Sequence, residues 1–200
     1  RACAENLVPC VLELGGKSPV LVGPKADLKK TTERLAIGKT LNAGQICLSP
    51  DYVFVPDGQA RAFAEELAQA FTRMYPTLLN NPDYTSIIAK RHYDRLRAHL
   101  ADAAGKGAEI IEVNPASENF ADQPTYKIPP TIVLNARSGM TILDEEIFGP
   151  ILPVMTYTDI QQVIDYVNAR PRPLAVYYFG PEDEDCDRYV RGTISGGVTI

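Results

Sequence analysis

Residues 152–179 read LPVMTYTDIQQVIDYVNARPRPLAVYYF and contain the pattern that decides the fold. Two apolar runs in this stretch, Leu152–Tyr157 and Leu174–Phe179, have the length and composition of buried strands. Between them, Asp159–Asn168 carries apolar residues at helical spacing. A strand, a helix and a second strand in this order predict a βαβ unit, in which the two strands run parallel.

The same alternation of strands and helices extends along the rest of the chain. Further strands are expected at Val11–Leu14, Pro19–Val22, Tyr52–Val55, Glu109–Val113, Thr131–Leu134 and Gly197–Ile200. Further helices are expected at Asp27–Leu41 with Asp27 as its cap, Gln59–Met74, Ser86–Ala104 and Glu182–Val190. Residues 114–130 hold four prolines and are expected to form a long exposed excursion. We therefore predict one α/β domain with a mainly parallel sheet covered by helices on both faces.

The composition excludes several classes of protein. The 200 residues are 45% hydrophobic and 22% charged, which is typical of a globular domain with a packed core. The net charge of −5 and the scattered basic residues argue against a nucleic-acid partner or an anionic membrane surface. No apolar run approaches the roughly 20 residues that a membrane helix needs.

The cysteines and the chain ends set two further expectations. The four cysteines form no C-x-x-C pair, and two histidines are too few for a Cys/His zinc site, so no metal is expected. A chain with a good core does not need disulfides, and we expect a reduced, cytoplasmic setting. The chain opens at Arg1 without a methionine and stops inside an expected strand. We therefore expect a piece of a longer protein.

Three stretches carry residues that are capable of chemistry. Glu13, in LELGGKSP, is expected to end a buried strand just before two glycines, where backbone can approach a ligand. Cys47 follows NAGQ, a break after a helix that could display the thiol in a cleft. Glu146 and Phe148, in EEIFGP, could hold a ribose and brace a flat ring system. Taken singly, each has an ordinary alternative: a strand-end glutamate, a buried cysteine, or a turn with a solvated charge pair. Lys17 is assigned no chemistry, and its side chain is expected to cover the turn.

The two histidines have a different setting. His92 and His99 lie seven residues apart and therefore share one face of their expected helix. Arg91, Arg95 and Arg97 lie beside them. We expect a solvated basic face.

The three motifs together resemble the aldehyde dehydrogenase superfamily. LELGGKSP, then GQIC with its cysteine 34 positions after the glutamate (47 − 13), then EEIFGP follow the order of that family and cover nearly the whole chain. Three stretches are similar to its class 3 and fatty-aldehyde branch, and most of all to bacterial coniferyl aldehyde dehydrogenases: Cys47–Tyr52, Arg170–Phe179 and Ser195–Ile200. The resemblance implies that residues 1–200 are the catalytic domain, without the cofactor-binding domain that precedes it in the family.

The resemblance also implies a role for each candidate residue. Cys47 would be the nucleophile that forms a thiohemiacetal and then a thioester, with its backbone N–H holding the oxyanion. Glu13 matches the general base that activates the water for thioester hydrolysis. Glu146 matches the carboxylate that binds the nicotinamide-side ribose, and Phe148 the ring that packs against the nicotinamide. The activity implied is NAD- or NADP-dependent oxidation of an aldehyde, of aromatic, coniferyl type, to the acid.

Two other functions stay open at this point. One is a non-catalytic structural or binding domain that keeps the fold; the other is a cofactor-independent thiol hydrolase, which requires a histidine beside Cys47. From the resemblance we expect the full-length protein to be a cytoplasmic homo-oligomer, a dimer, that acts on a small-molecule aldehyde. The isolated chain is expected to be inactive, because the family's oxyanion-hole asparagine and most of its cofactor site lie outside these residues.

Overall fold

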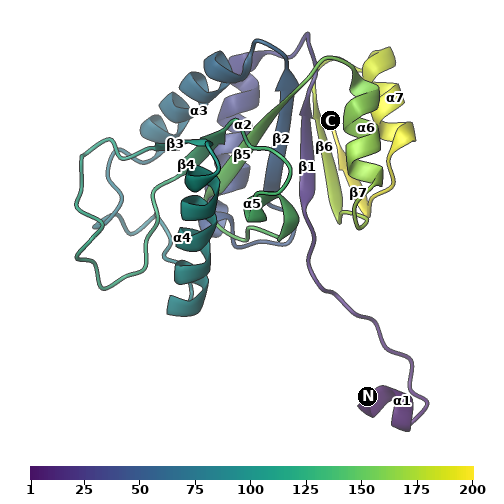
Figure 1. The fold of residues 1–200 in the computed structure, drawn as a ribbon, viewed down its shortest axis with the longest axis horizontal. Coiled ribbons are helices and arrows are strands. Elements are labelled where there is room, and N and C mark those ends of the chain that lie inside the picture. Colours follow the sequence, from purple (N-terminus) through teal and green to yellow (C-terminus); the bar gives the residue numbers. More distant parts are fainter.

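A seven-stranded sheet forms the centre of the computed structural model, which describes residues 1–200 (Figure 1). Its strand order is β3-β4-β5-β2-β1-β6-β7. The strands are β1 (Ser18–Val22), β2 (Pro50–Pro56), β3 (Glu109–Glu112), β4 (Thr131–Leu134), β5 (Ile151–Tyr157), β6 (Ala175–Phe179) and β7 (Gly197–Thr199). Every neighbouring pair is parallel except β3 with β4. The predicted, mainly parallel α/β fold is confirmed.

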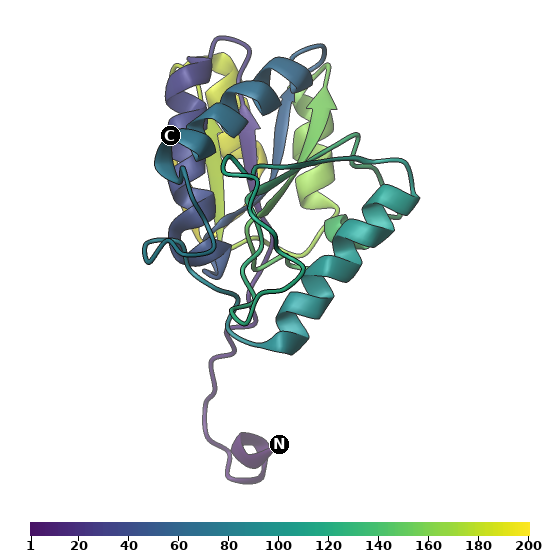
Figure 2. The same cartoon turned by 90° about the vertical axis from the view of Figure 1, so that its left-hand side faces the viewer.

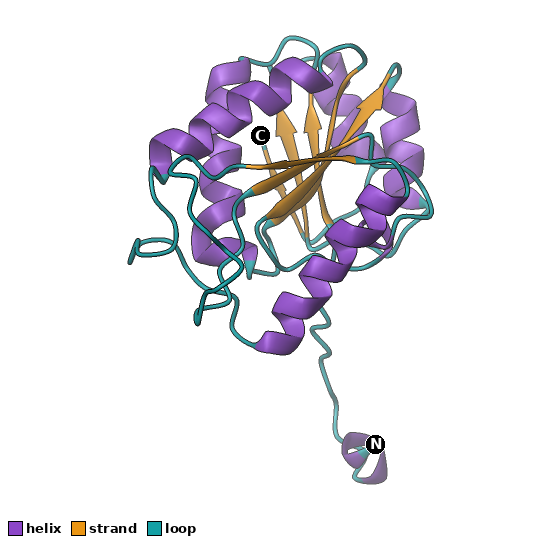
Figure 3. Ribbon diagram, turned by 60° about the vertical axis from the view of Figure 1, so that its left-hand side comes forward, coloured by secondary structure: helices purple, strands orange, loops and turns teal.

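Helices cover both faces of this sheet (Figures 2 and 3). They are α2 (Leu28–Thr40), α3 (Ala60–Met74), α4 (Lys90–Gly105), α5 (Thr141–Asp144), α6 (Ile160–Asn168) and α7 (Glu184–Gly192), with a 3₁₀ turn at Leu41–Gly44; a further short helix, α1 (Ala2–Glu5), lies away from the sheet. Helices α2 and α3 pack on one face, and α4 to α7 pack on the other. No helix has the length and apolar character that would let it span a membrane.

The alternating side chains of the central strands divide the core in two. Tyr52 and Phe54 on β2 belong to a cluster of 26 buried residues under α4 to α7. Val53 and Val55, the residues between and after them, belong to a cluster of 16 under α2 and α3. Successive side chains on a strand point to opposite faces, so a strand covered on both sides must be apolar throughout. This is why residues 52–55 of β2, YVFV, form an unbroken apolar run.

Aspartate side chains cap the starts of α2 and α6; the sequence predicts the Asp27 cap but not the Asp159 cap. The Asp27 side chain accepts a hydrogen bond of 3.0 Å from Lys30 N at the start of α2. At the start of α6, Asp159 accepts one of 2.9 Å from Gln161 N. Each bond satisfies a backbone donor that has no partner within the helix, which fixes where the helix begins.

The first 17 residues correct one expectation. Val11–Leu14 is not a strand; it belongs to an exposed extended segment that leads away from the sheet to α1 (Figure 1). Leu7, Val11 and Leu14 are all exposed on this segment. A β-favouring run becomes a strand only where a partner strand pairs with it, and no strand of the sheet pairs with this one.

Two loops also differ from expectation. Helix α4 begins at Lys90 instead of Ser86, because the Gln45 side chain bonds to the Ser86 carbonyl and the Ile88 N–H, both at distances of 2.9 to 3.0 Å, and holds that stretch outside the helix. Within residues 114–130, Lys127 is buried against neighbouring carbonyls. This proline-rich segment is therefore pinned to the molecule at Lys127 and is not exposed along its whole length.

Candidate active site

The three sequence motifs meet because each precedes one of three neighbouring strands. Residues 13–17 lead into β1, Cys47 precedes β2, and residues 145–150 lead into β5. These strands are adjacent and parallel in the order β5-β2-β1. Parallel strands start at the same edge of a sheet, so the fold gathers distant parts of the chain along one edge.

Cys47 follows a strained turn. Asn42, Ala43 and Gly44 have consecutive positive φ angles of 51°, 52° and 72°. Residues with a side chain adopt this left-handed region reluctantly, so the turn stores strain. A Cβ on Gly44 would collide with the carbonyl of Gly149, so this turn packs directly against the end of the EEIFGP loop. Tight packing of this kind keeps the strained turn in place.

Hydrogen bonds hold the residues on either side of the thiol. Ser49 N donates to Ile46 O at 2.9 Å and closes a turn around Cys47. From β6, the Tyr177 hydroxyl donates to Leu48 O at 2.5 Å. Burial, and then the nearby Cys47, raise the pKa of Tyr177, so its phenol stays a neutral donor. The Cys47 thiol is free and half-buried. Sequence reasoning missed Tyr177, because its contact spans 129 residues.

A groove of about 710 Å³ opens beside this turn, between α2 and the strands β6 and β7. Ile46 and Leu48, the two neighbours of Cys47, belong to its wall. Its other apolar and aromatic lining residues include Leu35, Leu41, Tyr177 and Ile200. Charged residues, among them Lys30 and Arg34, line the groove as well, so it offers apolar contacts beside Cys47 together with polar groups.

Glu13 is placed differently from expectation. It is exposed on the extended segment before β1, and does not end a buried strand. Its carboxylate accepts a hydrogen bond of 3.3 Å from Gly15 N, two residues further on. No hydrogen bond joins Glu13 to Cys47. The fold brings the two residues to the same edge of the sheet without pairing their side chains.

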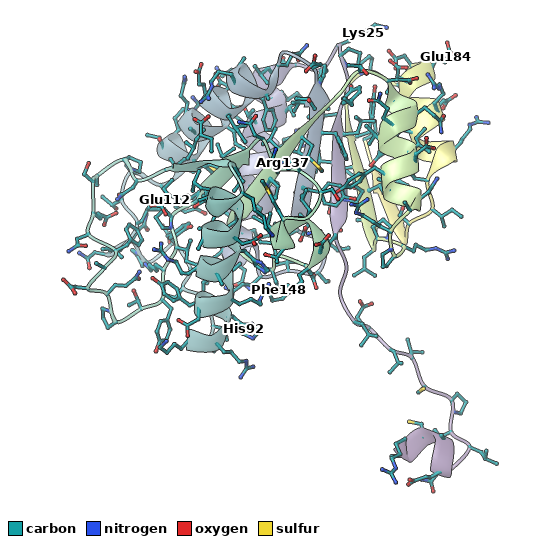
Figure 4. All side chains as sticks on the ribbon, viewed as in Figure 1. Lys25, His92, Glu112, Arg137, Phe148 and Glu184 are labelled. Atoms are coloured by element: carbon teal, nitrogen blue, oxygen red, sulfur yellow. The ribbon has the colours of Figure 1, made fainter.

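Glu146 and Phe148 lie at the same edge. A Cβ on Gly15, whose φ is +79°, would collide with Glu146 Oε2, so the carboxylate lies against bare backbone. Burial raises the pKa of Glu146, and the Gly16 amide opposes this shift. The Phe148 ring is 37% exposed at the end of the sheet from which the N-terminal segment leaves (Figure 4). A half-buried carboxylate and an accessible ring two residues apart fit the ribose and the flat ring of a nicotinamide nucleotide.

Lys17 corrects another expectation, because it does more than cover a turn. Its ammonium pairs with Asp51, donates to Ile142 O at 2.9 Å and donates to Glu145 O at 2.6 Å. Asp51 Oδ2 in turn accepts from Ile147 N at 2.9 Å. The pair ties the segments before β1 and β5 to the start of β2. A signal was present in the sequence, since an aspartate beside the apolar run YVFV requires a buried partner.

The histidines do not form the expected solvated face. His99 is only 4% exposed, while His92 is half-buried and accepts a hydrogen bond of 3.3 Å from Arg91 Nε. His99 contacts Arg95 and Thr141, so neither histidine bonds to Cys47. The structure also gathers no group of three or more histidine, cysteine or acidic side chains that could hold a metal ion.

Comparisons with known proteins identify the family. The aldehyde dehydrogenase family matches the chain over residues 1–200. The chain therefore belongs to the aldehyde dehydrogenase family, whose members are oxidoreductases.

Its similarity to particular relatives is high. Over 200 residues, all of this chain, it is 52% identical to the "Probable coniferyl aldehyde dehydrogenase" of Caulobacter vibrioides, of which it covers 41%. It is 50% identical to the coniferyl aldehyde dehydrogenase of a Pseudomonas species, of which it covers 42%. The substrate-bound structure of Staphylococcus aureus AldH superposes with a TM-score of 0.88 at 35% identity, over 98% of this chain and 42% of that one. The chain thus spans about two fifths of the length of the relatives it matches.

Proposed function

We propose that residues 1–200 are the catalytic domain of an NAD(P)-dependent aldehyde dehydrogenase that oxidises an aromatic aldehyde of coniferyl type to its acid. The observation that carries this proposal is the Cys47 turn, where a free thiol lies between two apolar residues that line a groove of about 710 Å³. The identity with coniferyl aldehyde dehydrogenases supports the substrate class. The cofactor-binding domain corresponds to the part of the relatives that this chain does not cover.

The chemistry assigns one task to each residue. Cys47 adds to the aldehyde carbon, so that a C–S bond forms and its backbone N–H holds the oxygen of the thiohemiacetal. NAD or NADP, when bound, supplies the acceptor for the hydride whose loss leaves a thioester on Cys47. Glu13 then takes a proton from a water that attacks the thioester carbonyl; the C–S bond breaks, the acid leaves and the thiol is restored. Glu146 binds the ribose, and Phe148 packs against the nicotinamide.

Glu13 must come within reach of the thioester to do this. The exposed apolar side chains of its segment support a packing partner that orients it, which we propose is the cofactor-binding domain. Gly15 and Gly16 give the backbone between Glu13 and β1 the freedom to adjust.

Two alternatives have less support. A thiol hydrolase needs a histidine beside the nucleophile, and both histidines bond elsewhere. A non-catalytic domain has no use for a thiol held on a strained turn beside a groove. We also propose that the full-length protein is a cytoplasmic homodimer. Four free cysteines support a reducing compartment, and the exposed edge strand β7 supports an assembly partner.

Two substitutions in the full-length dehydrogenase test the assigned roles. Cys47→Ala is expected to abolish both the NADH burst and turnover, because no covalent adduct forms. Glu13→Gln is expected to release one burst of NADH and then to turn over about 10² to 10⁴ times more slowly, because deacylation lacks its base. Intact mass spectrometry is expected to find the acyl group on Cys47.

Cys10→Ala, at an exposed thiol outside the site, is the control and is expected to keep full activity. Aldehyde-dependent NADH formation that survives Cys47→Ala would reject the proposal. A Glu13→Gln enzyme with neither burst nor adduct would assign Glu13 to activation of the thiol, and full steady-state activity would remove it from the mechanism.

A further inference from the structure

We propose that His99, in its neutral form, is a positioning residue that fixes the loop carrying Glu146 and Phe148 by holding the guanidinium of Arg95. Only the loop's role in binding a cofactor rests on the proposed function. The positioning itself rests on hydrogen bonds between the helices α4 and α5 and the loop before β5.

Arg95 on α4 holds two successive carbonyls of this loop. Its Nη1 donates to Glu146 O at 2.9 Å, and its Nη2 donates to Ile147 O at 2.6 Å. The guanidinium is planar and its donors form a rigid fork, so the two bonds together fix the orientation of both peptide groups. The backbone on which Glu146 and Phe148 stand is therefore held from α4.

His99, one turn along the same helix, holds Arg95 in turn. Its Nε2 lies 3.0 Å from Arg95 Nη1. A guanidinium can only donate, so Nε2 must carry no proton and must accept. The imidazole proton is then on Nδ1, which lies 2.9 Å from Thr141 Oγ1 and donates to it. The Thr141 hydroxyl in turn donates a hydrogen bond of 3.3 Å to Asp102 Oδ2. This series of bonds selects one neutral tautomer of His99.

The surrounding charges favour the neutral form. Burial, and then the Arg95 cation, lower the pKa of His99 below its usual 6.5, and Lys17 adds to this. Glu145 and Asp102 are the acidic groups that face it and oppose the shift. Glu145 Oε2 lies 3.6 Å from Nε2. A proton on Nε2 would take the place of the lone pair that faces Arg95 Nη1, so the ring could no longer accept from Arg95.

The sign of the pH effect follows from the direction of this pKa shift. Because the pKa of His99 is lower in the folded protein, the positioning is complete above pH 6.5. It is lost as the pH falls through the lowered pKa, where the ring gains its second proton. The loop then loses one of the contacts that orient Arg95.

The experiment compares this chain with its His99→Leu and His99→Gln variants by hydrogen exchange of the amides of residues 145–149, corrected for intrinsic rates. It is run at pH 7.5 and at a lower pH at which imidazole ¹⁵N NMR shows the wild-type His99 ring protonated. Leucine removes the acceptor, and exchange is expected to be about 3- to 10-fold faster than in the wild type at pH 7.5, the range for one lost hydrogen bond. The glutamine oxygen keeps an acceptor that does not titrate. Exchange in His99→Gln is expected to stay slow at both pH values, whereas exchange in the wild type becomes faster at the lower one.

His92→Asn, at the other histidine of α4, is the matched control and is expected to exchange like the wild type. Imidazole ¹⁵N NMR at pH 7.5 is expected to show the proton on Nδ1. A proton on Nε2, or equal exchange in the Leu and Gln variants at pH 7.5, would overturn the proposal. If His99→Leu does not fold, the wild type and His99→Gln decide alone at the lower pH, where NMR shows the wild-type ring protonated, and an equal rate in these two contradicts the proposal.

The full-length dehydrogenase separates this inference from the proposed function. His99→Leu is expected to raise the KM for NAD about tenfold while His99→Gln restores it at pH 7.5. If exchange in the loop changes as expected and the KM for NAD does not, then His99 positions a loop that is not the cofactor site. That result would contradict the roles proposed for Glu146 and Phe148 and leave the role of His99 standing.

Discussion

Lys39, at the end of α2, is a cation buried without a carboxylate partner. It is 1% exposed, and its Nζ donates to Pro50 O at 2.8 Å. Burial lowers the pKa of Lys39 to about 8, and the attraction of Asp51 offsets only part of this. The ammonium is thus less favourable inside the protein than in water, and Lys39 lowers the stability of the fold at neutral pH.

Lys39→Met is therefore expected to stabilise the chain. A pKa that falls from 10.5 to about 8 on folding means that the buried lysine destabilises the wild type by roughly 3 kcal/mol at pH 7. The variant avoids this cost but leaves the Pro50 carbonyl without a hydrogen-bond donor, which costs about 1 kcal/mol. Urea unfolding at pH 7 is expected to show a gain of about 1 to 2 kcal/mol. As the pH rises from 8 to 10.5, the free energy of unfolding of the wild type is expected to increase relative to that of the variant. In this range Lys39 is deprotonated in the folded wild type and still protonated in the unfolded chain.

The exposed Lys29 on the same helix gives the control, and Lys29→Met is expected to change the free energy of unfolding by less than about 0.5 kcal/mol. A Lys39→Met chain that is less stable than the wild type at pH 7 would show that the bond to Pro50 outweighs the burial of the charge.

For single helices and strands, the sequence predicts those features that depend on the local pattern of apolar residues and caps. The strand Thr131–Leu134 is found as predicted, and α2 and α6 begin after the aspartates that cap them. Val11–Leu14 has an equally β-favouring composition and is not a strand, because pairing depends on a neighbour that local pattern does not show. In the same way, helical spacing puts His99 on a face but does not show that the face packs against α5.

The candidate site also contains some residues that the sequence predicts and others that only the fold reveals. Cys47, Glu13, Glu146 and Phe148 can be predicted because a resemblance in short motifs points to them. The groups that hold them in place, such as Tyr177, come from distant parts of the chain and belong to no motif. They become visible only when the fold is known.

The Lys17–Asp51 pair joins three elements, so its loss is expected to destabilise the whole edge of the sheet. Both side chains are nearly buried, and Lys17→Met leaves the Asp51 charge without its partner. We expect the free energy of unfolding in urea to fall by about 3 to 5 kcal/mol, the usual range for breaking a buried pair.

Lys25→Met is the matched control. Lys25 pairs with Asp183 on the surface, at the opposite end of β1 (Figure 4), and its loss is expected to lower the free energy of unfolding much less than Lys17→Met does, because water screens this pair. Similar small losses in the two variants would mean that water screens the Lys17–Asp51 pair as it screens the surface pair.

At the scale of the whole molecule, the edge on which the site lies runs against a general rule. Open α/β sheets usually bind ligands beyond the carboxyl ends of their strands. Here the three motifs precede β1, β2 and β5 and lie at the amino ends. The fold class alone would therefore point to the wrong edge, and only the motifs locate the site.

The whole chain is expected to bind NAD too weakly to measure by calorimetry. The residues proposed to contact the cofactor, Glu146 and Phe148, lie on one loop and meet only the nicotinamide end. Contacts of this extent do not offset the several kcal/mol of lost translational and rotational freedom that binding requires. Full-length dehydrogenase in the same calorimeter is the control and is expected to bind. Micromolar affinity in the 200-residue chain would mean that the cofactor site lies within it.

The central position of β1 has a consequence for the chain while it is being synthesised. Val20 on β1 pairs with Val53 on one side and with Tyr177 on the other, 157 positions later (177 − 20). One edge of β1 therefore stays open on the ribosome until β6 has been translated. Contacts between such distant positions form slowly, and an open apolar strand edge can pair with another nascent chain. A transcript cut short between β1 and residue 175 would thus yield a polypeptide in which one edge of β1 has no partner strand, and this polypeptide is expected to be prone to aggregate.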